Sequence, residues 1–249
     1  MSSLFDNDGP KGLAIETSSR HGSVAVSYGP HLLQTIELPV GNRHATELMP
    51  AISALTAKVG WRPDQIEHVY LSLGPGSFTG LRIAIAIARA MHQAVGCKLL
   101  GVPTLNVIAE NAPGAFAYIV PILDAKRGQV FAARYRRTGA GGELVRVAEP
   151  ALVEPAEYVR ETLRIANGAT MGVLGEGVEY HRTALACIPA ESVQMLDPSH
   201  WPPRAATVHR LGYRLAQQGA FANPATLLPI YIRLPEAEEV WRKKHGVPL

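Results

Sequence analysis

A strand, a glycine-rich turn, a long helix and a second strand follow one another between residues 69 and 101. Val69–Leu73 is a short apolar run of the kind that forms a buried strand. The turn GPGSFTG at residues 74–80 opens the helical segment Phe78–Val95, and Lys98–Gly101 is the next strand. Two strands joined by one crossover helix run parallel in the same sheet. The segment therefore predicts an α/β fold with a parallel pair at its centre.

The helical segment Phe78–Val95 has almost no polar face. Only Arg82, Arg89 and the pair His92–Gln93 interrupt its apolar residues. A helix that is apolar nearly all round is usually buried on more than one side. We therefore expect either a second layer of this chain or another subunit to cover its outer face.

Three short β-rich runs open the chain: Leu13–Thr17, Ser23–Tyr28 and Leu32–Leu38. Glycine and proline residues separate them, which is typical of consecutive antiparallel strands. Between Arg43 and Val59 the apolar residues recur at steps of three and four, which predicts a helix. Pro50 lies inside this helix and is expected to bend or break it near its first turns.

The order of strands and helices restarts in the second half of the chain. Its expected elements are a short helix from Thr104, a hairpin of Tyr118–Asp124 and Gln129–Tyr135, a strand Leu144–Val147, a helix Glu154–Ile165, a strand Met171–Leu174 and a helix Val178–Ala186. A last amphipathic helix contains Ala205, Val208, Leu211 and Leu215. We predict two related α/β lobes with mixed sheets flanked by helices. The first lobe comprises residues 1–103 plus about 204–225, and the second comprises 104–203 plus the C-terminal segment.

The charge balance does not mark a nucleic-acid-binding protein, because 24 basic and 21 acidic residues give a formal charge of only +3. Basic residues cluster at Arg134, Arg136 and Arg137 and again at Arg242, Lys243 and Lys244. Runs as short as these are more often a solvated surface than a phosphate-binding site.

The cysteines and the apolar runs bear on the compartment. Cys97 and Cys187 are too few for a disulfide framework, which indicates a reducing environment. The opening MSSLFDNDGPKG lacks the apolar core of a secretory signal, and no apolar run approaches the ~20 residues of a membrane-spanning helix. We expect a cytoplasmic protein.

The glycine loop is the first candidate for a binding site. Gly74, Gly76, Ser77, Thr79 and Gly80 lie between a strand and a helix N-terminus, where backbone N–H groups could hold a phosphate. The loop is not a P-loop, because Leu81 and Arg82 stand where a Lys-Ser/Thr pair would follow the last glycine. The alternative is a tight turn in which glycines supply unusual backbone angles.

Two smaller sets of polar residues are weaker candidates for a functional site. His44 and Glu47 share a helix face, but a pair without convergent partners is more often a surface or interface hydrogen-bonding pair. Asp124, Lys126 and Arg127 could form an acid–base set, yet their place in a hairpin favours a turn-stabilising role.

The opening Ile15-Glu16-Thr17-Ser18-Ser19, followed by Gly22–Val26, resembles the first phosphate hairpin of the actin/Hsp70/sugar-kinase group. This resemblance implies actin/Hsp70-like (RNase H-like) lobes. In that group an aspartate stands where Glu16 stands here. A longer carboxylate would displace a bound metal or water by about one methylene, which argues against a working ATPase.

A narrower resemblance rests on the runs LAIETSSRHGSVAV, HATELMPAI, LGPGSFTGLRIAIAIARA, GVPTL, ILDAKRGQVFAARY and YIRLPEAE. In order and spacing they are similar to the bacterial TsaB (YeaZ) family, and GPGSFTGLR is the most specific of them. The resemblance implies a subunit of the complex that makes N6-threonylcarbamoyladenosine on tRNAs reading codons that begin with A. It also implies two partners, the catalytic paralogue TsaD and the ATPase TsaE, with a separate synthase supplying threonylcarbamoyl-adenylate.

The catalytic paralogue shares the glycine loop and then carries a His-x-x-x-His pair after the following strand. Two histidines four residues apart lie on one helical face and can bind one metal ion. Alignment through the Gly-Val of that strand places these positions at Thr104 and Ile108, neither of which can replace imidazole. The resemblance therefore implies a non-catalytic subunit with no metal and no cofactor of its own, while a nucleotide at the joint with its partners is left open.

The apolar helix supplies the expected partner interface. Its candidate contact residues, with those of the preceding helix, are His44, Leu48, Ile52, Arg82, Ile85, Ala86 and Arg89. We expect this surface to form a homodimer when the chain is alone and a heterodimer with the paralogue. The alternative function is an ATP-dependent kinase or metallopeptidase of the same superfamily, which fold similarity alone does not exclude. The missing metal ligands, Glu16 and the absent P-loop lysine favour the partner subunit.

Overall fold

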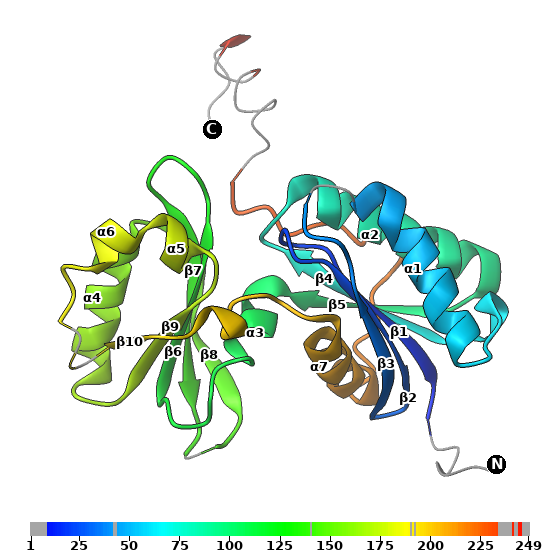
Figure 1. Cartoon of the computed structure of the whole chain (residues 1–249), viewed down its shortest axis with the longest axis horizontal. Helices are drawn as coiled ribbons and strands as arrows, with labels where there is room; N and C mark the ends of the chain where they lie inside the picture. Colours follow the sequence, from blue (N-terminus) through cyan, green and yellow to red (C-terminus); the bar gives the residue numbers. More distant parts are fainter. Residues whose placement is uncertain are drawn as a thin grey trace. The chain divides into compact units, whose positions relative to one another are not determined.

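The chain folds into two compact units, each built on one five-stranded mixed sheet (Figure 1). The computed structural model describes residues 9–41, 44–139, 141–189, 191, 193–233, 241, 244 and 245. The first unit comprises Met1–Asn111 with Pro202–Pro229, and the second comprises Ala112–Trp201 with Ile230–Leu249. The predicted class, two α/β lobes with mixed sheets flanked by helices, is confirmed.

The sheet of the first unit has the strand order β3-β2-β1-β4-β5. β1 (Lys11–Glu16) pairs antiparallel with β2 (Ser23–Tyr28), which pairs antiparallel with β3 (His31–Glu37). On its other side β1 runs parallel to β4 (His68–Gly74), and β4 runs parallel to β5 (Lys98–Pro103). The predicted opening meander and the predicted parallel crossover are therefore both present.

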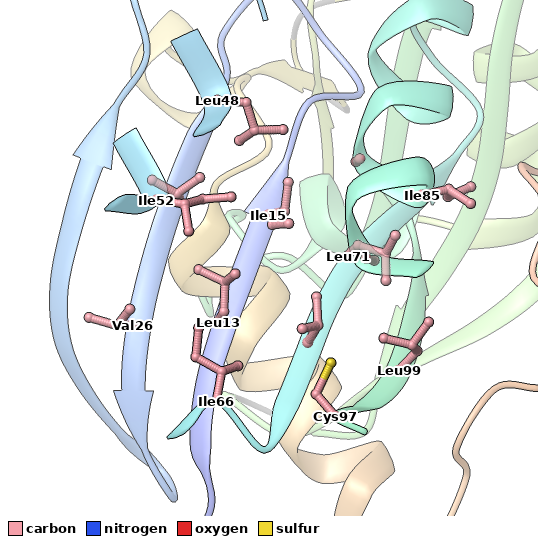
Figure 2. Close-up of a cluster of buried hydrophobic side chains, with 14 of the residues drawn as sticks. Leu13, Ile15, Val26, Leu48, Ile52, Ile66, Leu71, Ile85, Cys97 and Leu99 are labelled. Atoms are coloured by element: carbon pink, nitrogen blue, oxygen red, sulfur yellow. The ribbon is translucent and has the colours of Figure 1, made fainter. Parts of the chain in front are cut away.

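One face of this sheet is covered by α1 (His44–Lys58) and α2 (Phe78–Val95), with a 3-10 turn at Pro63–Gln65 between α1 and β4. Figure 2 shows the core that they enclose, in which the labelled side chains come from both helices, from the sheet and, for Ile66 and Cys97, from the residues just before β4 and β5. These are Leu13, Ile15, Val26, Leu48, Ile52, Ile66, Leu71, Ile85, Cys97 and Leu99. Burying each large aliphatic side chain contributes about 1.5–3 kcal/mol, so this core is the main source of stability on this face.

The other face is covered by α3 (Thr104–Ala109) and α7 (Ala205–Gln217). Tyr70 of β4, Val107 of α3 and Val208 of α7 belong to one buried cluster there. The predicted boundary at residue 103 assigned the helix from Thr104 to the second lobe, and this is wrong. The helix belongs to the first unit because its side chains are buried against β4, β5 and α7.

The boundaries of α2 follow from its capping residues. The Ser77 hydroxyl accepts a hydrogen bond from the Gly80 N–H at 3.2 Å, and Gly96 ends the helix in the left-handed conformation, with φ 74°. Arg82 and Ala86 lie on the outer face and are exposed. Among the described residues, these two positions are left uncovered, whereas Arg89 of the same helix contacts the segment that follows α7.

The prediction for Pro50 was a bend or a break in α1, and the structure shows no break. The helix continues from His44 to Lys58 with the proline inside it. Pro50 is exposed, while Leu48 and Leu55 are fully buried on the opposite side. A proline removes one backbone hydrogen bond, and burial of the apolar stripe outweighs that local loss.

The second unit repeats the strand pattern of the first, with the order β10-β9-β6-β7-β8. The central strand β6 (Tyr118–Asp124) begins an antiparallel meander with β7 (Val130–Arg137) and β8 (Leu144–Val153). On its other side β6 is parallel to β9 (Met171–Leu174), and β9 is parallel to β10 (Val193–Met195). The two lobes are thus related by topology, as predicted.

Helices α4 (Pro155–Ala166), α5 (Gly177–Tyr180) and α6 (Arg182–Leu185) pack around this sheet, followed by a 3-10 turn at Pro198–His200. The single helix predicted over Val178–Ala186 is wrong, because His181 adopts a non-helical conformation between α5 and α6.

Two further observations complete the description of the fold. The strand predicted over Leu144–Val147 continues to Val153, since Ala151, Leu152 and Val153 still pair with β7. Among the described residues, no helix combines the length and the apolar character that crossing a membrane requires.

Candidate functional site

Three segments meet at one edge of the first sheet, where β1, β4 and β5 reach their carboxyl ends. They are the turn after Glu16, the glycine loop after β4 and the start of α3. In open α/β sheets ligands bind at the carboxyl ends of the strands. This edge is therefore the place in the first unit where a site is expected.

Glu16 ends β1 with its side chain completely buried. The Ser18 N–H donates to Glu16 Oε1 at 2.6 Å, the Ser18 hydroxyl donates to the same oxygen, and the Ser72 hydroxyl donates to Oε2. Burial raises the pKa of Glu16, and the hydrogen bonds from Ser18 and Ser72 offset only part of that rise. The carboxyl group is therefore turned into the protein, and neighbouring residues bond both of its oxygens.

The glycine loop packs directly on the segment that follows β1. The Ser77 N–H donates to the Ser18 carbonyl at 2.6 Å, and the Thr17 hydroxyl donates to the Gly80 carbonyl at 2.9 Å. A Cβ atom at Gly76 or Gly80 would lie well inside 3.0 Å of the backbone of Ser18 or Thr17, a separation that real Cβ atoms essentially never show. Two of the loop's glycines are therefore required by the close approach of two backbones.

These contacts bear on whether the loop holds a phosphate. The N–H of Ser77 is bonded to Ser18, and the N–H of Gly80 is bonded to the Ser77 hydroxyl. The N–H of Gly74 donates to the Thr104 hydroxyl at 3.1 Å. Three loop N–H groups thus have partners inside the protein, which favours the tight-turn interpretation. Anion binding by Gly74, Gly76, Ser77, Thr79 and Gly80 stays a prediction.

Thr104 and Ile108, the positions that the resemblance matches to a histidine pair, are both fully buried in α3. Thr104 is engaged by the Gly74 N–H, and Ile108 offers no ligand atom. Within the described part of the chain, no group of three or more His, Cys, Asp and Glu side chains is placed to hold a metal ion. The edge therefore holds hydroxyls and one enclosed carboxyl group instead of a convergent donor set.

The hairpin set Asp124, Lys126 and Arg127 is organised as a turn. Lys126 Nζ lies 2.6 Å from Asp124 Oδ2, and His181 Nε2 lies 3.2 Å from Asp124 Oδ1. Burial acts to raise the pKa of Asp124, but the hydrogen bonds from Lys126 and His181 outweigh it and hold that pKa below its usual value. Both Lys126 and Arg127 adopt positive φ, at 61° and 55°. Sequence reasoning missed His181, because its separation of 57 residues from Asp124 gives no local signal.

The basic cluster on β7 does not form one charged surface. Arg134 is buried, and Arg137 donates to the carbonyls of Gly142 and Ala112, while Arg136 is exposed. Each arginine thus has a separate environment. In the second cluster, Arg242 and Lys243 lie outside the described residues and Lys244 is exposed.

The predicted partner interface needs a correction. Leu48, Ile52 and Ile85 point into the core of the first unit, with at most 5% of each residue exposed (Figure 2). In α2, which is apolar nearly all round, the periodicity did not distinguish the stripe that faces the sheet from the one that faces outward. In α1 the apolar stripe that contains Leu48 and Ile52 is the one that faces the core. These three residues are therefore core residues and not candidates for a partner surface.

The other proposed interface residues lie in different environments. Arg89 Nη2 donates to the Ala225 carbonyl at 3.0 Å, so it holds the segment that follows α7. Arg82 and Ala86 are exposed, and the Arg82 guanidinium lies 5.0 Å from the centre of the Phe78 ring. The His44 side chain, with its proposed pairing to Glu47, lies outside the described residues.

A cavity of about 520 Å³ lies in the second unit between α5, α6 and β10. Its lining is mostly apolar and includes Val178, Leu185 and Trp201. The two charged residues of the lining already have partners, since Arg182 is paired with Glu179, and Asp197 accepts a hydrogen bond from the Ser199 N–H. The cavity therefore lacks the convergent polar groups that orient a bound ligand.

Comparison with known proteins agrees with this arrangement. The family model for TsaD, tRNA N6-adenosine threonylcarbamoyltransferase, matches residues 39–196, which is more than half of the chain. A Bacillus subtilis protein named tRNA threonylcarbamoyladenosine biosynthesis protein TsaB is 25% identical over 92% of this chain and 96% of its own length. The Escherichia coli protein of the same name is 30% identical over 52% of this chain and 56% of its own length.

The solved structure of YeaZ from Pseudomonas aeruginosa has the same fold, with a TM-score of 0.75 and 23% identity over 89% of this chain and 99% of that one. The two structures therefore agree in fold over most of this chain. The chain belongs to the TsaD family of tRNA N6-adenosine threonylcarbamoyltransferases and, within that family, to the TsaB (YeaZ) group.

Proposed function

We propose that this chain is a non-catalytic subunit of the system that forms N6-threonylcarbamoyladenosine on tRNA, and that it binds and activates the catalytic TsaD paralogue. The names of its relatives support the modification system. The observation that supports a non-catalytic role is the buried pair Thr104 and Ile108.

The chemistry of these two positions carries the argument. A metal that activates a substrate needs ligands with lone pairs and at least one position open to that substrate. Ile108 has no such atom, and the Thr104 hydroxyl accepts a hydrogen bond from the loop. Glu16, the nearby carboxyl group, is enclosed by Ser18 and Ser72 and is unavailable to a metal-bound water. The groups that bind a metal and activate the substrate would have to come from another subunit.

The exposed side of α1 and α2 is the surface that we propose for contact with the paralogue. Met49 is 50% exposed and Phe78 is 37% exposed, and Arg82 and Ala86 lie on the same side of α2 as Phe78. Phe78, Arg82 and Ala86 follow one another at four-residue steps, so they form one stripe along the helix. A methionine, an aromatic ring and an arginine are residue types enriched at protein interfaces. The same stripe is proposed to form a homodimer when the paralogue is absent, and the ATPase TsaE is proposed to join the heterodimer.

The test is reconstitution with purified components. The chain alone, the cognate TsaD paralogue alone and the two together are incubated with tRNA, the ATPase and a source of threonylcarbamoyl-adenylate. Modified nucleoside is measured by mass spectrometry after digestion of the tRNA. We expect product only when both proteins are present. Product formed by the chain without the paralogue would refute the non-catalytic role.

The alternative function is tested with the same preparation. ATP turnover on small-molecule acceptors and cleavage of peptides are measured with the chain alone, before and after addition of zinc or iron. Turnover that depends on a stoichiometric metal would favour a kinase or a metallopeptidase over the partner subunit.

A further inference from the structure

Three consecutive residues of the hairpin between β6 and β7 are left-handed: Lys126 with φ 61°, Arg127 with φ 55° and Gly128 with φ 75°. Glycine takes this conformation without a steric penalty, whereas a residue with a Cβ atom does not. Lys126 and Arg127 are both exposed, so packing in the core does not account for their presence in this turn. Backbone strain of this kind is concentrated at ligand-binding and switch regions.

Arg233 adds a third cation to this hairpin from the far end of the chain. Its guanidinium donates to the Ala125 carbonyl through Nη1 and to Gln129 Oε1 through Nη2. Ala125 and Gln129 lie on either side of the left-handed turn, and the Ala125 N–H donates to the Gln129 carbonyl at 3.0 Å. The hairpin therefore brings Lys126, Arg127 and Arg233 into one small region of the second unit.

The carboxyl group at this hairpin is covered, while the cations face outward. The Asp124 side chain is only 8% exposed, because it lies 2.6 Å from Lys126 Nζ and 3.2 Å from His181 Nε2. The Lys126 side chain is 71% exposed. Glu179 of α5 is exposed, but it forms an ion pair with Arg182 at 2.5 Å. The outer surface of the hairpin is therefore positively charged.

Two exposed tyrosines lie beside these cations. Tyr180 is 46% exposed, and the centre of its ring lies 5.0 Å from Lys126 Nζ. Tyr231 is 42% exposed and precedes Arg233 by two residues in the segment that this arginine attaches to the hairpin. Surfaces that bind unpaired RNA combine these two residue types, because bases stack on aromatic rings and cations bind the phosphate groups.

We propose that the β6–β7 hairpin is a binding surface for an unpaired segment of tRNA, formed by Lys126, Arg127, Arg233 and Tyr180. The three cations contact phosphodiester groups, and Tyr180 stacks on a base. This inference rests on the proposed function, which supplies tRNA as the substrate of the system. It assigns to the second unit of this chain a direct contact with tRNA, in addition to any contact that the paralogue makes.

Removal of two charges tests the phosphate contacts. The double variant Lys126→Gln, Arg127→Gln keeps a side chain at both left-handed positions, and Arg136→Gln at the other end of β7 is its matched control. Labelled, unmodified tRNA is titrated with the full chain between about 50 and 200 mM salt. The double variant is expected to bind roughly tenfold more weakly at about 0.1 M salt, with the slope of log K against log salt reduced by about 1.4. Parent-like binding by the double variant, or no binding by the parent chain at the lowest salt, would overturn the proposal.

A second pair of variants tests the stacking and does not disturb the turn. Tyr180→Phe keeps the aromatic ring, whereas Tyr180→Leu removes it. We expect Tyr180→Phe to bind tRNA as the parent chain does and Tyr180→Leu to bind about fivefold more weakly or worse. Equal affinities of the two variants for tRNA would contradict the assignment of Tyr180.

Competition separates tRNA from other ligands. ATP at an equal concentration of phosphate groups is expected to displace little tRNA. Displacement by ATP that matches displacement by unlabelled tRNA would identify a nucleotide site instead. Loss of binding to the paralogue or to the ATPase by the double variant, with its tRNA affinity unchanged, would identify a protein interface, and either result overturns the proposal.

The reconstituted reaction distinguishes this inference from the proposed function. The double variant is expected to raise the KM for tRNA there, and the control variant is not. A reaction that forms product equally well without the chain would refute the proposed function, even if the chain binds tRNA through the hairpin. A reaction that requires the chain, combined with a chain that does not bind tRNA, would refute only the hairpin surface.

Discussion

The contact between the glycine loop and the segment after β1 can be tested by adding one methyl group at a time. Gly76, Gly80 and Gly96 differ in what that methyl group would meet. At Gly76 the backbone has φ +156° and the new Cβ would overlap Ser18. At Gly80 the conformation is helical, but the Cβ would overlap Thr17. At Gly96 the φ of +74° is left-handed, and no atom lies within 4 Å of the new Cβ.

These differences predict a different loss of stability for replacement by alanine at each of the three glycines. Gly96→Ala meets only the left-handed penalty of roughly 1–2 kcal/mol, reduced by the lower entropy of the unfolded chain. Gly80→Ala gains about 1 kcal/mol of helix propensity but forces an overlap with fixed backbone that costs about 1–3 kcal/mol. Gly76→Ala combines an unfavourable φ with a backbone overlap, and we expect it to lose about 3 kcal/mol or more.

Hydrogen exchange in β1 and α2 measures these losses within the first unit, so that unfolding of the second unit does not obscure them. We expect Gly76→Ala to lose more stability than either Gly80→Ala or Gly96→Ala. Equal losses at Gly76 and Gly96 would refute the packing argument, because only the φ penalty would then operate. A Gly76→Val variant that folds and binds the paralogue normally but loses a nucleotide signal would identify the loop as a ligand site.

Three further outcomes are expected. Ala86→Glu should prevent binding to the paralogue without unfolding the chain, whereas Ile85→Glu should unfold the first unit. Light scattering measures binding and circular dichroism measures folding. An Ala86→Glu variant that still binds the paralogue contradicts the proposed surface. Burial lowers the pKa of His68 and His209, so these residues bind protons when the chain unfolds in mild acid. The free energy of unfolding should therefore fall as the pH drops from about 7 to 5. Urea titrations that give the same free energy of unfolding across this range would contradict the prediction. Burial raises the pKa of Glu16, so its contribution to stability is lost as the pH rises through that pKa, and Glu16→Gln should remove this loss. A Glu16→Gln variant whose free energy of unfolding falls with rising pH as much as that of the parent chain would count against it.

The sequence was most informative where local chemistry fixes an element. The helix Phe78–Val95 has the predicted bounds, because the serine that caps its first turn and the glycine that ends it lie directly next to it in the sequence. The strands Tyr118–Asp124 and Met171–Leu174 also have the predicted bounds, since each is a short apolar run with a turn after it. Elements of this kind are set by residues close together in the sequence.

The candidate residues were harder to place, because their environments depend on partners far along the chain. Ile85 and Ala86 are adjacent and both apolar, yet one is buried and the other exposed, and only the position of the sheet decides between them. Arg134 and Arg136 should share a strand face by simple alternation. The irregular pairing beside Arg134 and the cover of α4 instead bury one and expose the other.

The edge where a ligand would be expected in the first unit is instead closed by hydrogen bonds between its own segments. Ser18 is bonded on both sides, since its N–H and hydroxyl donate to Glu16 and its carbonyl accepts from the N–H of Ser77. The Thr104 hydroxyl joins the third segment through the N–H of Gly74. A metal or phosphate bound here would have to displace several of these buried bonds, each of which leaves an unsatisfied group at about 1–3 kcal/mol. The buried Thr104 and Ile108 and the internal bonding of this edge therefore point the same way, and both support the proposal that this chain supplies a rigid surface for the paralogue while the paralogue supplies the chemistry.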